Sequence, residues 1–429
     1  MQGGGKVEPA RLPPAPARPG PARPPFALVA MLALGLLINY ADRGSLAIAA
    51  PLIEKQLGLS PSQLGWVLSA FFWTYVPFQP VSGWLVDRVG AARVLAGGFA
   101  LWSLATLLTG LTSGLVMLVG LRLLMGAGES VFYPSALSLL AREVRDRHRV
   151  RATGTMQFGA LVGPALGTLV GGLIMARFGW RAMFVSLGIA SLIWLVPWMR
   201  VVNRERQETT ASRASVGREP KPTFSAILRQ RALWGGTAGI FCSNYAFYFV
   251  FTWLPLYLTH ERGLSLLAMT RMTTAFYIVD ALSVLATAWL LDAWIARGAT
   301  INRAYKTALV CSSLGVGTCL LLCTGVGLPL IGITIVGLGF MDGLNSPATC
   351  ALTQAFAGPS ATGRWMGVQN AAANTAGMVA PVLTGYLVEF TGHYTAALVV
   401  AGAAALCGSL AWLLVVPVVR PVDWRTLAP

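Results

Sequence analysis

Apolar residues recur along this chain in long runs that short polar segments interrupt. A helix needs about 20 apolar residues to cross the hydrocarbon core of a bilayer, and most of these runs reach that length. The pattern predicts twelve spans, at 26–50, 63–86, 93–112, 115–140, 152–176, 182–200, 232–258, 268–291, 304–324, 328–354, 365–388 and 394–417. The predicted fold class is therefore an all-α membrane protein with twelve transmembrane helices.

Composition agrees with this class. Hydrophobic residues make up 55% of the chain, charged residues 11%, and the mean hydropathy is +0.65. Soluble domains carry roughly 25% charged residues, so a soluble protein is excluded. All six cysteines lie in the apolar runs without zinc-type spacing, so we expect small packing residues there.

The net charge of +16 is distributed in a way that argues against nucleic-acid binding. Most Lys and Arg residues lie in alternate loops, at 87–93, 142–151, 200–231 and 292–306, and the intervening loops are short and poor in cations. Cytoplasmic loops carry this excess of positive charge. We therefore predict that both termini are cytoplasmic.

The longest polar segment, 201–231, divides the spans six and six and is predicted to be a cytoplasmic linker. It separates an N-terminal six-helix bundle, 26–200, from a C-terminal one, 232–417. Residues 1–25 are rich in Pro, Gly and Arg and are expected to be a disordered cytoplasmic tail. Residues 418–429 form the other tail. The first span lacks a cleavage pattern, so a removable signal peptide is not expected.

The two halves echo one another. Span 2 ends with Trp84 and Asp87, and span 8 ends with Trp289 and Asp292. Spans 5 and 11 carry glycines and prolines at similar spacing: Gly159, Gly163, Pro164, Gly167, Gly171; Gly377, Pro381, Gly385. Parallel six-span repeats are the arrangement of major facilitator transporters. Such glycines let helices approach closely, either to slide or for static packing.

Two spans contain adjacent or facing charges. Asp42 and Arg43 lie in span 1, and Arg122 and Glu129 lie in span 4. Charge at this depth costs at least a few kcal/mol per residue, so it usually marks a ligand or ion pathway. Arg122 and Glu129 share a helix face roughly 10 Å apart along the axis. Helix rise places Arg43 and Arg122 at one depth, on the order of 12 Å below the outer surface.

These four residues are predicted to form one site with no net charge when all are ionised. Such a set is tolerated in a low-dielectric interior when its members pair or face water. Protonating one carboxylate would release an arginine, which can hold a substrate carboxylate through two hydrogen bonds. The pattern favours proton-coupled anion transport, and the structural alternative is a fixed ion pair that joins spans 1 and 4.

Further polar residues lie in the spans. Asp280 and Asp342 lack an evident basic partner in the sequence, and either could hold a proton or line a cavity. Candidate hydrogen-bonding groups for a polar substrate are Tyr40, Tyr75, Gln157, Asn244, Tyr248, Asn345, Asn370 and Asn374. Buried amides also join helices to one another, so both roles stay open for each of them.

Residues 26–417 resemble the major facilitator superfamily and, within it, the anion:cation symporter family. The resemblance is carried by four patterns: Asn39-Tyr40-x-Asp42-Arg43, Arg122…Gly126-x-Gly128-Glu129…Pro134, Trp253-Leu254-Pro255 and Asn370…Asn374…Gly377…Pro381…Gly385. It implies two pseudo-symmetric six-helix bundles that work by alternating access. It also implies proton-driven import of an organic carboxylate such as a sugar acid.

The resemblance assigns roles to individual residues. Asp42 and Glu129 would carry protons, and Arg43, Tyr40, Tyr75 and Asn370 would contact substrate. We add Arg122, Gln157, Asn244, Tyr248 and Asn374 as substrate-binding candidates. Ala160 stands where several sugar-acid members carry glutamine, which leaves room for a less polar carboxylate.

The segment from Gly83 to Arg93 resembles the loop motif that follows span 2 in the superfamily. Its gating residues would be Gly83, Asp87, Arg88, Gly90 and Arg93, with Asp292 as the counterpart in the second half. In the superfamily this motif latches the cytoplasmic side in the outward-open state.

Other functions are less well supported by the residues. An anion exchanger is the alternative transport mode, because the Gly/Pro pattern of span 5 is similar to one found in antiporters. A non-transporting membrane sensor would not need the charged site. No enzyme is expected, since His148, His260 and His393 lie in loops and no nucleophile–base pair is visible.

The expected partners are a small organic anion, protons and the bilayer, with no nucleic acid and no cofactor beyond the proton gradient. A monomer is expected. The loop at 54–62 is short and the chain has no Asn-x-Ser/Thr glycosylation sequence, which favours a bacterial inner membrane.

Overall fold

A computed structural model describes residues 26–144, 146–208, 223–422 and 424. This part of the chain is helical and contains no strand. The helices of the first half are α1 (Phe26–Leu57), α2 (Pro61–Val89), α3 (Ala91–Thr109), α4 (Leu115–Glu129), α5 (Phe132–Glu143) and α6 (Asp146–Glu208). The predicted tail 1–25, the central part of the predicted linker and most of the last residues lie outside the described residues.

The second half begins with the short helix α7 (Phe224–Leu228). It continues with α8 (Arg231–Leu256), η2 (Tyr257–Glu261), α9 (Leu266–Ala296), α10 (Ile301–Leu322), α11 (Leu328–Asp342), α12 (Asn345–Asn374), α13 (Ala376–Thr391), α14 (Thr395–Leu410) and η3 (Ala411–Val415). Nine helical segments of the described chain are long and apolar enough to cross a membrane.

Two predicted spans, 115–140 and 328–354, are each broken into two helices. α4 ends at Glu129 before α5 begins, and α11 ends at Asp342 before α12 begins. Pro134 and Pro347 follow these breaks, and a proline cannot donate to the carbonyl four residues earlier. Both breaks therefore have the same cause, and each leaves a carboxylate at the end of a helix inside the bundle.

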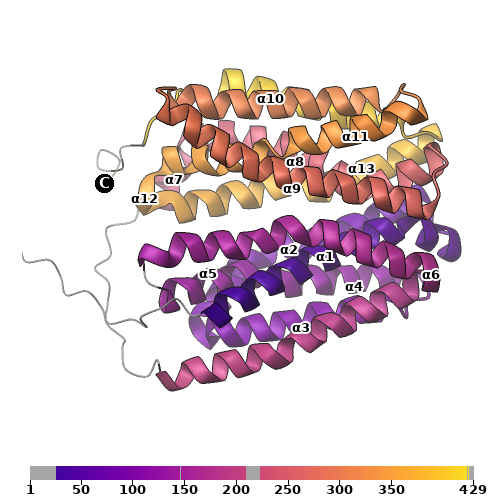
Figure 1. Cartoon of the computed structure of the whole chain (residues 1–429), viewed down its shortest axis with the longest axis horizontal. Coiled ribbons are helices and arrows are strands. Elements are labelled where there is room, and N and C mark those ends of the chain that lie inside the picture. Colours follow the sequence, from indigo (N-terminus) through magenta and orange to yellow (C-terminus); the bar gives the residue numbers. More distant parts are fainter. Residues whose placement is uncertain (1–25, 145, 209–222, 423, 425–429) are drawn as a thin grey trace, which may run out of the picture.

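Figure 1 shows two helical bundles lying side by side, with the first half of the chain below and the second half above. At one end of the molecule lie the start of α1, the helix α7 and the last described residues. We call this the terminal end. The opposite end, which carries the connection between α1 and α2, is called the distal end.

The glycine rows of spans 5 and 11 have different neighbours. Gly159 and Gly163 lie against the backbone of α1, within their own bundle. Gly377 lies against the Phe72 ring, and Gly385 against the Pro61 carbonyl, both in the other bundle. The first row therefore packs one bundle together, whereas the second joins the two bundles near the distal end.

A carboxylate also joins the bundles at the distal end. Ser60 caps the N-terminus of α2 and forms a capping box with Gln63. Glu389 of α13 accepts hydrogen bonds from Ser60 Oγ and from the Ser62 backbone N–H, both at 2.9 Å. A negative charge is favourable at this position because a helix N-terminus is partially positive.

Candidate functional site

The centre of the site is a buried ion pair between α1 and α4. Arg43 donates from Nε and Nη2 to Oε2 of Glu129, at 2.9 and 2.7 Å. The two residues are only 7% and 1% exposed. The second carboxylate oxygen of Glu129 has no hydrogen-bond partner among the described residues. The ion pair is thus shielded from water, and Arg43 binds only one of the two carboxylate oxygens of Glu129.

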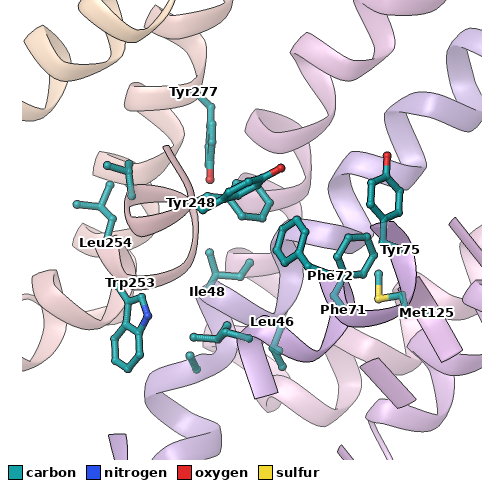
Figure 2. Packing of buried hydrophobic residues seen from close by; sticks show 14 of the residues in the cluster. Leu46, Ile48, Phe71, Phe72, Tyr75, Met125, Tyr248, Trp253, Leu254 and Tyr277 are labelled. Atoms are coloured by element: carbon teal, nitrogen blue, oxygen red, sulfur yellow. The ribbon is translucent and has the colours of Figure 1, made fainter. Parts of the chain in front are cut away.

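Aromatic rings surround the Arg43 guanidinium. Its Cζ lies 4.9, 4.7 and 4.8 Å from the ring centroids of Tyr40, Phe71 and Tyr75. Phe71 and Tyr75 stack on each other and lie beside Met125 in Figure 2. A cation over an aromatic face gains about 2 kcal/mol or more when desolvated. The rings therefore partly replace the water that a buried guanidinium has lost.

Arg122 lies at the same depth, as the helix-rise estimate predicted, because its Cζ is 5.3 Å from the same Phe71 ring. It is 5% exposed and has no carboxylate partner among the described residues. Its Nη1 approaches only the Met125 sulfur, at 3.1 Å, and its Nε has no partner. A thioether is a weak acceptor, so this guanidinium is a buried cation with free donors.

Asp42 forms no ion pair with Arg43 or Arg122 within the described chain, so the predicted four-charge site is wrong in this respect. Successive residues of a helix point about 100° apart, and Asp42 faces α6 while Arg43 faces α4. Its Oδ2 accepts a hydrogen bond from Ser191 Oγ at 2.9 Å, and its Oδ1 has no partner. Sequence reasoning missed Ser191, which carries no signal beyond being a hydroxyl residue in a span.

Several candidate substrate contacts are occupied by one another. The Tyr248 hydroxyl donates to Asn374 Oδ1, and Asn374 Nδ2 donates to the Asn370 carbonyl at 2.8 Å. The Tyr133 hydroxyl donates to Gln157 Oε1 at 3.2 Å. These hydrogen bonds join candidate residues to one another. The side chain of Asn370 is exposed and forms no hydrogen bond within the described chain.

Asn345 joins two helices. Its Nδ2 donates to Ser243 Oγ of α8 at 3.0 Å, and its Oδ1 accepts from Thr349 at 3.1 Å. Asn244, which follows Ser243 in α8, is partly buried. The packing role, which the sequence left open, thus accounts for both polar ends of Asn345.

The site lies where the bundles meet. Tyr248 of α8 packs edge-on against Phe72 of α2, with ring centroids 4.5 Å apart, and Figure 2 shows the two rings together. The ring centroids of Phe72 and Phe71 are 5.0 Å apart, and the Phe71 ring in turn contacts Arg43. A chain of aromatic rings therefore runs from the second bundle to the ion pair. The sequence analysis did not single out Phe71 or Phe72, although the spacing of Phe71 and Tyr75 places both on one helix face.

The predicted gating residues lie at the terminal end. Asp87, Arg88, Arg93 and Asp292 are exposed, and none of them forms an ion pair within the described chain. Arg88 lies over the Trp84 ring at 5.2 Å. Gly90 ends α2 with a φ of 103°, a conformation that favours glycine.

Two helical bundles that meet at a buried, charged site are the architecture of secondary transporters. The family model of the Major Facilitator Superfamily matches residues 32–305 and 272–428. The chain belongs to this superfamily. It is a multi-pass membrane transporter and not an enzyme, and no group of three or more metal-binding side chains occurs among its described residues.

The chain is similar to curated transporters over nearly its whole length. It is 29% identical to the D-galactonate transporter of Escherichia coli O6:H1, with 92% of this chain and 96% of that protein covered. It is 31% identical to the hexuronate transporter of Bacillus subtilis, with 92% and 94% covered. The probable sulfoacetate transporter of Cupriavidus necator is 30% identical, with 91% and 93% covered.

A solved structure shares the fold. A bacterial homologue of the human lysosomal transporter Spinster, in an inward-facing and occupied conformation, matches with a TM-score of 0.72 and 15% identity. The match covers 91% of this chain and 96% of that one. This likeness shows the major facilitator fold and the two six-helix bundles that the sequence predicted.

Proposed function

We propose that the protein is a proton-coupled symporter that imports an organic carboxylate, such as a sugar acid, across a bacterial inner membrane. In this proposal the terminal end is cytoplasmic, as the basic loops favour. The distal contacts then close the outer side of the site. Alternating access would break these contacts and bring the exposed gating residues of the terminal end together.

The Arg43–Glu129 ion pair is the observation that carries this proposal. A proton that binds Glu129 removes its charge and the attraction that holds Arg43 against it. Arg43 is then a buried cation without a counter-ion, which is costly in a low-dielectric interior. A substrate carboxylate can supply the missing charge and accept two parallel hydrogen bonds from the guanidinium. Proton binding and anion binding thereby support each other.

Arg122 adds a second cation to the same place. Both guanidinium groups contact the Phe71 ring, and Arg122 has donors that no protein oxygen occupies. An anion between the two arginines would satisfy these donors as well as those that Glu129 releases. The exposed Asn370 side chain and the Tyr75 hydroxyl are then candidates for contacts with the rest of the substrate. Asp42 is a second candidate proton carrier, because its buried carboxyl group accepts a hydrogen bond from the neutral Ser191 hydroxyl and forms no ion pair within the described chain.

The relatives support the chemical class of the substrate. The curated proteins quoted above are named for galactonate, hexuronate and sulfoacetate, which are organic anions. The glycine pattern of span 5, which suggested exchange, also has a packing role: Gly159 and Gly163 lie against α1, and Gly172 lies against Thr270 of α9.

The experiment uses the purified full chain. Thermal-shift screening with D-galactonate, D-glucuronate and other organic acids identifies a ligand, because binding to the folded state raises the melting temperature. Uptake into proteoliposomes is then measured with a pH gradient, for the wild type and for Glu129→Gln. We expect the gradient to drive accumulation by the wild type and not by the variant, which should still bind the anion. Full accumulation by Glu129→Gln would overturn the coupling role, and uptake that ignores the pH gradient would overturn symport.

A further inference from the structure

The second bundle repeats the backbone frame that holds Glu129. α4 and α11 each have 15 residues, and they end at Glu129 and Asp342. Pro134 and Pro347 follow the two carboxylates at the same spacing. Asp342 is therefore the structural counterpart of Glu129.

The helices that face these carboxylates correspond too. Gly126 of α4 lies against the Phe71 carbonyl, and Gly339 of α11 lies against the Phe276 carbonyl. Both glycines stand at the same position in their helices, counted back from the last residue. The shift in numbering that carries Phe71 onto Phe276 also carries Trp84 onto Trp289 and Asp87 onto Asp292. The same shift carries Tyr75, which contacts Arg43, onto Asp280.

The counterpart of Arg43 is not a cation. Aligning Pro51 of α1 with Pro255 of α8 places Phe247 opposite Arg43. Phe247 and Asp342 line one crevice that is too narrow to hold a water molecule, and Arg43 and Glu129 meet in the same way in the first bundle. The second bundle thus has a carboxylate at the place of Glu129, a second one at the place of Tyr75, and an apolar ring at the place of the guanidinium.

The surroundings of the two carboxylates offer no counter-ion. The rest of the crevice is apolar, with Ala246, Val250, Phe276, Val316 and Leu338 as its lining. Gly343, next to Asp342, packs on the Asp280 backbone, and the two carboxylates repel each other. Tyr277, a buried titratable side chain of α9, lies within range of both charges. Neither aspartate has an ion pair or a hydrogen bond within the described chain.

We propose that Asp280 and Asp342 form a second proton site, in which one bound proton takes the place that the Arg43 guanidinium occupies in the first bundle. The proton binds an oxygen of one carboxylate, and the resulting O–H donates a hydrogen bond to the other. Two neighbouring carboxylates in an apolar interior do not both stay ionised. The pair therefore takes up its proton as one unit. This site is separate from the proposed function, because it needs neither the substrate nor Glu129.

Infrared difference spectra of the purified full chain, recorded between alkaline and mildly acidic pH, test the proposal without any substrate. A protonated carboxyl group has a carbonyl band that the carboxylate and the amide lack. We expect each of Asp280→Asn and Asp342→Asn to remove or shift the same band, and the double variant to lack it. Glu129→Gln should retain this band, so the two proton sites are distinguished.

Ser283→Ala is the matched control. Ser283 donates to the Phe340 carbonyl at 2.6 Å across the same α9–α11 contact but does not titrate, so its loss should leave the band unchanged. Asparagine is close in size to aspartate, and melting curves verify that each variant is folded. An unchanged spectrum in the double variant would overturn the site. Two independent bands, one lost in each single variant, would overturn the shared proton.

Discussion

The two bundles place a carboxylate at the same break in the same helix but surround it differently. Glu129 meets an arginine held by three aromatic rings, whereas Asp342 meets a phenylalanine and a second aspartate. The proline-induced break and the glycine contacts are common to both halves. The shared backbone arrangement therefore positions a carboxylate in each bundle. The residue that faces this carboxylate from the first long helix of the bundle, Arg43 or Phe247, determines whether the carboxylate has a fixed cation as its partner. This difference fits the proposal that the first bundle binds the carboxylate group of the substrate.

The largest effect is expected from removing the cation of the first site. Arg43→Ala leaves Glu129 buried without a partner, and breaking a buried pair in this way costs about 3–5 kcal/mol of stability. Transport should be lost. Chemical unfolding in detergent measures the loss, and Arg43→Ala/Glu129→Gln should recover a large part of it. Asp342→Asn provides the comparison from the second bundle, because Asp280 can then keep the proton and stay uncharged, so stability should fall much less than in Arg43→Ala. A similar loss in both bundles would contradict the difference between them.

Arg122→Gln should separate binding from stability. Arg122 has no carboxylate partner, so its removal leaves no buried anion behind. The affinity for the organic acid found by thermal shift should fall about 10- to 100-fold, as expected for loss of one charge-assisted contact. The unfolding free energy should change little. Arg122→Lys should recover part of the affinity, since lysine keeps the charge without the planar fork. Unchanged affinity in Arg122→Gln would remove this residue from the binding site.

Much of the fold could be predicted from the sequence. Span length, the alternation of basic loops and the repeated Trp-x-x-Asp ends depend on local composition, so they predict membrane helices and two six-span halves. The sequence places Pro134 and Pro347 among the prolines that interrupt spans, and the helices α4 and α11 end shortly before these two residues. A proline removes the hydrogen bond to the carbonyl four residues earlier, but Pro77, Pro164 and Pro381 do so inside continuous helices, so this rule alone does not locate the breaks.

The site was predicted in part. Helix rise gave the common depth of Arg43 and Arg122, because depth along one helix depends on residue number alone. The direction of Asp42 could not be obtained in this way. Its partner Ser191 comes from a helix far along the chain, and the rotation of α1 is set by packing in three dimensions. The bond between Glu389 and Ser60 could not be predicted either, because it joins helices that are far apart in the chain. The local sequence indicates only the capping box that Ser60 forms.

The repeated glycine contacts provide a smaller test of the shared frame. A methyl group at Gly126 would collide with the Phe71 carbonyl, and one at Gly339 would lie 2.6 Å from the Phe276 carbonyl. Gly126→Ala and Gly339→Ala should each lower stability by about 1–3 kcal/mol, as overpacking does. Gly120→Ala in α4 is the control, because nothing lies within 4 Å of its added methyl group. If only Gly126→Ala is destabilising, the two halves do not share this contact.

The smallest effect is expected at the distal end, where Glu389 joins the bundles in an exposed place. Glu389→Gln keeps the size of the side chain but removes the charge that favours the N-terminus of α2. We expect a modest shift toward conformations with a separated distal end. Spin labels at Lys55 and His393, which are exposed near this end in different bundles, measure the distance distribution.

Tyr386→Phe is the matched variant for this measurement. It removes a longer bond between the bundles, in which Trp66 Nε1 donates to the Tyr386 hydroxyl at 3.4 Å, and leaves the charge of Glu389 in place. A bond of this length contributes less than one to a carboxylate, so the distance distribution should move less than in Glu389→Gln. If the two variants behave alike, the charge of Glu389 does not hold the distal end closed. Closure would then depend on the apolar and glycine contacts between α2 and α13, which neither variant alters.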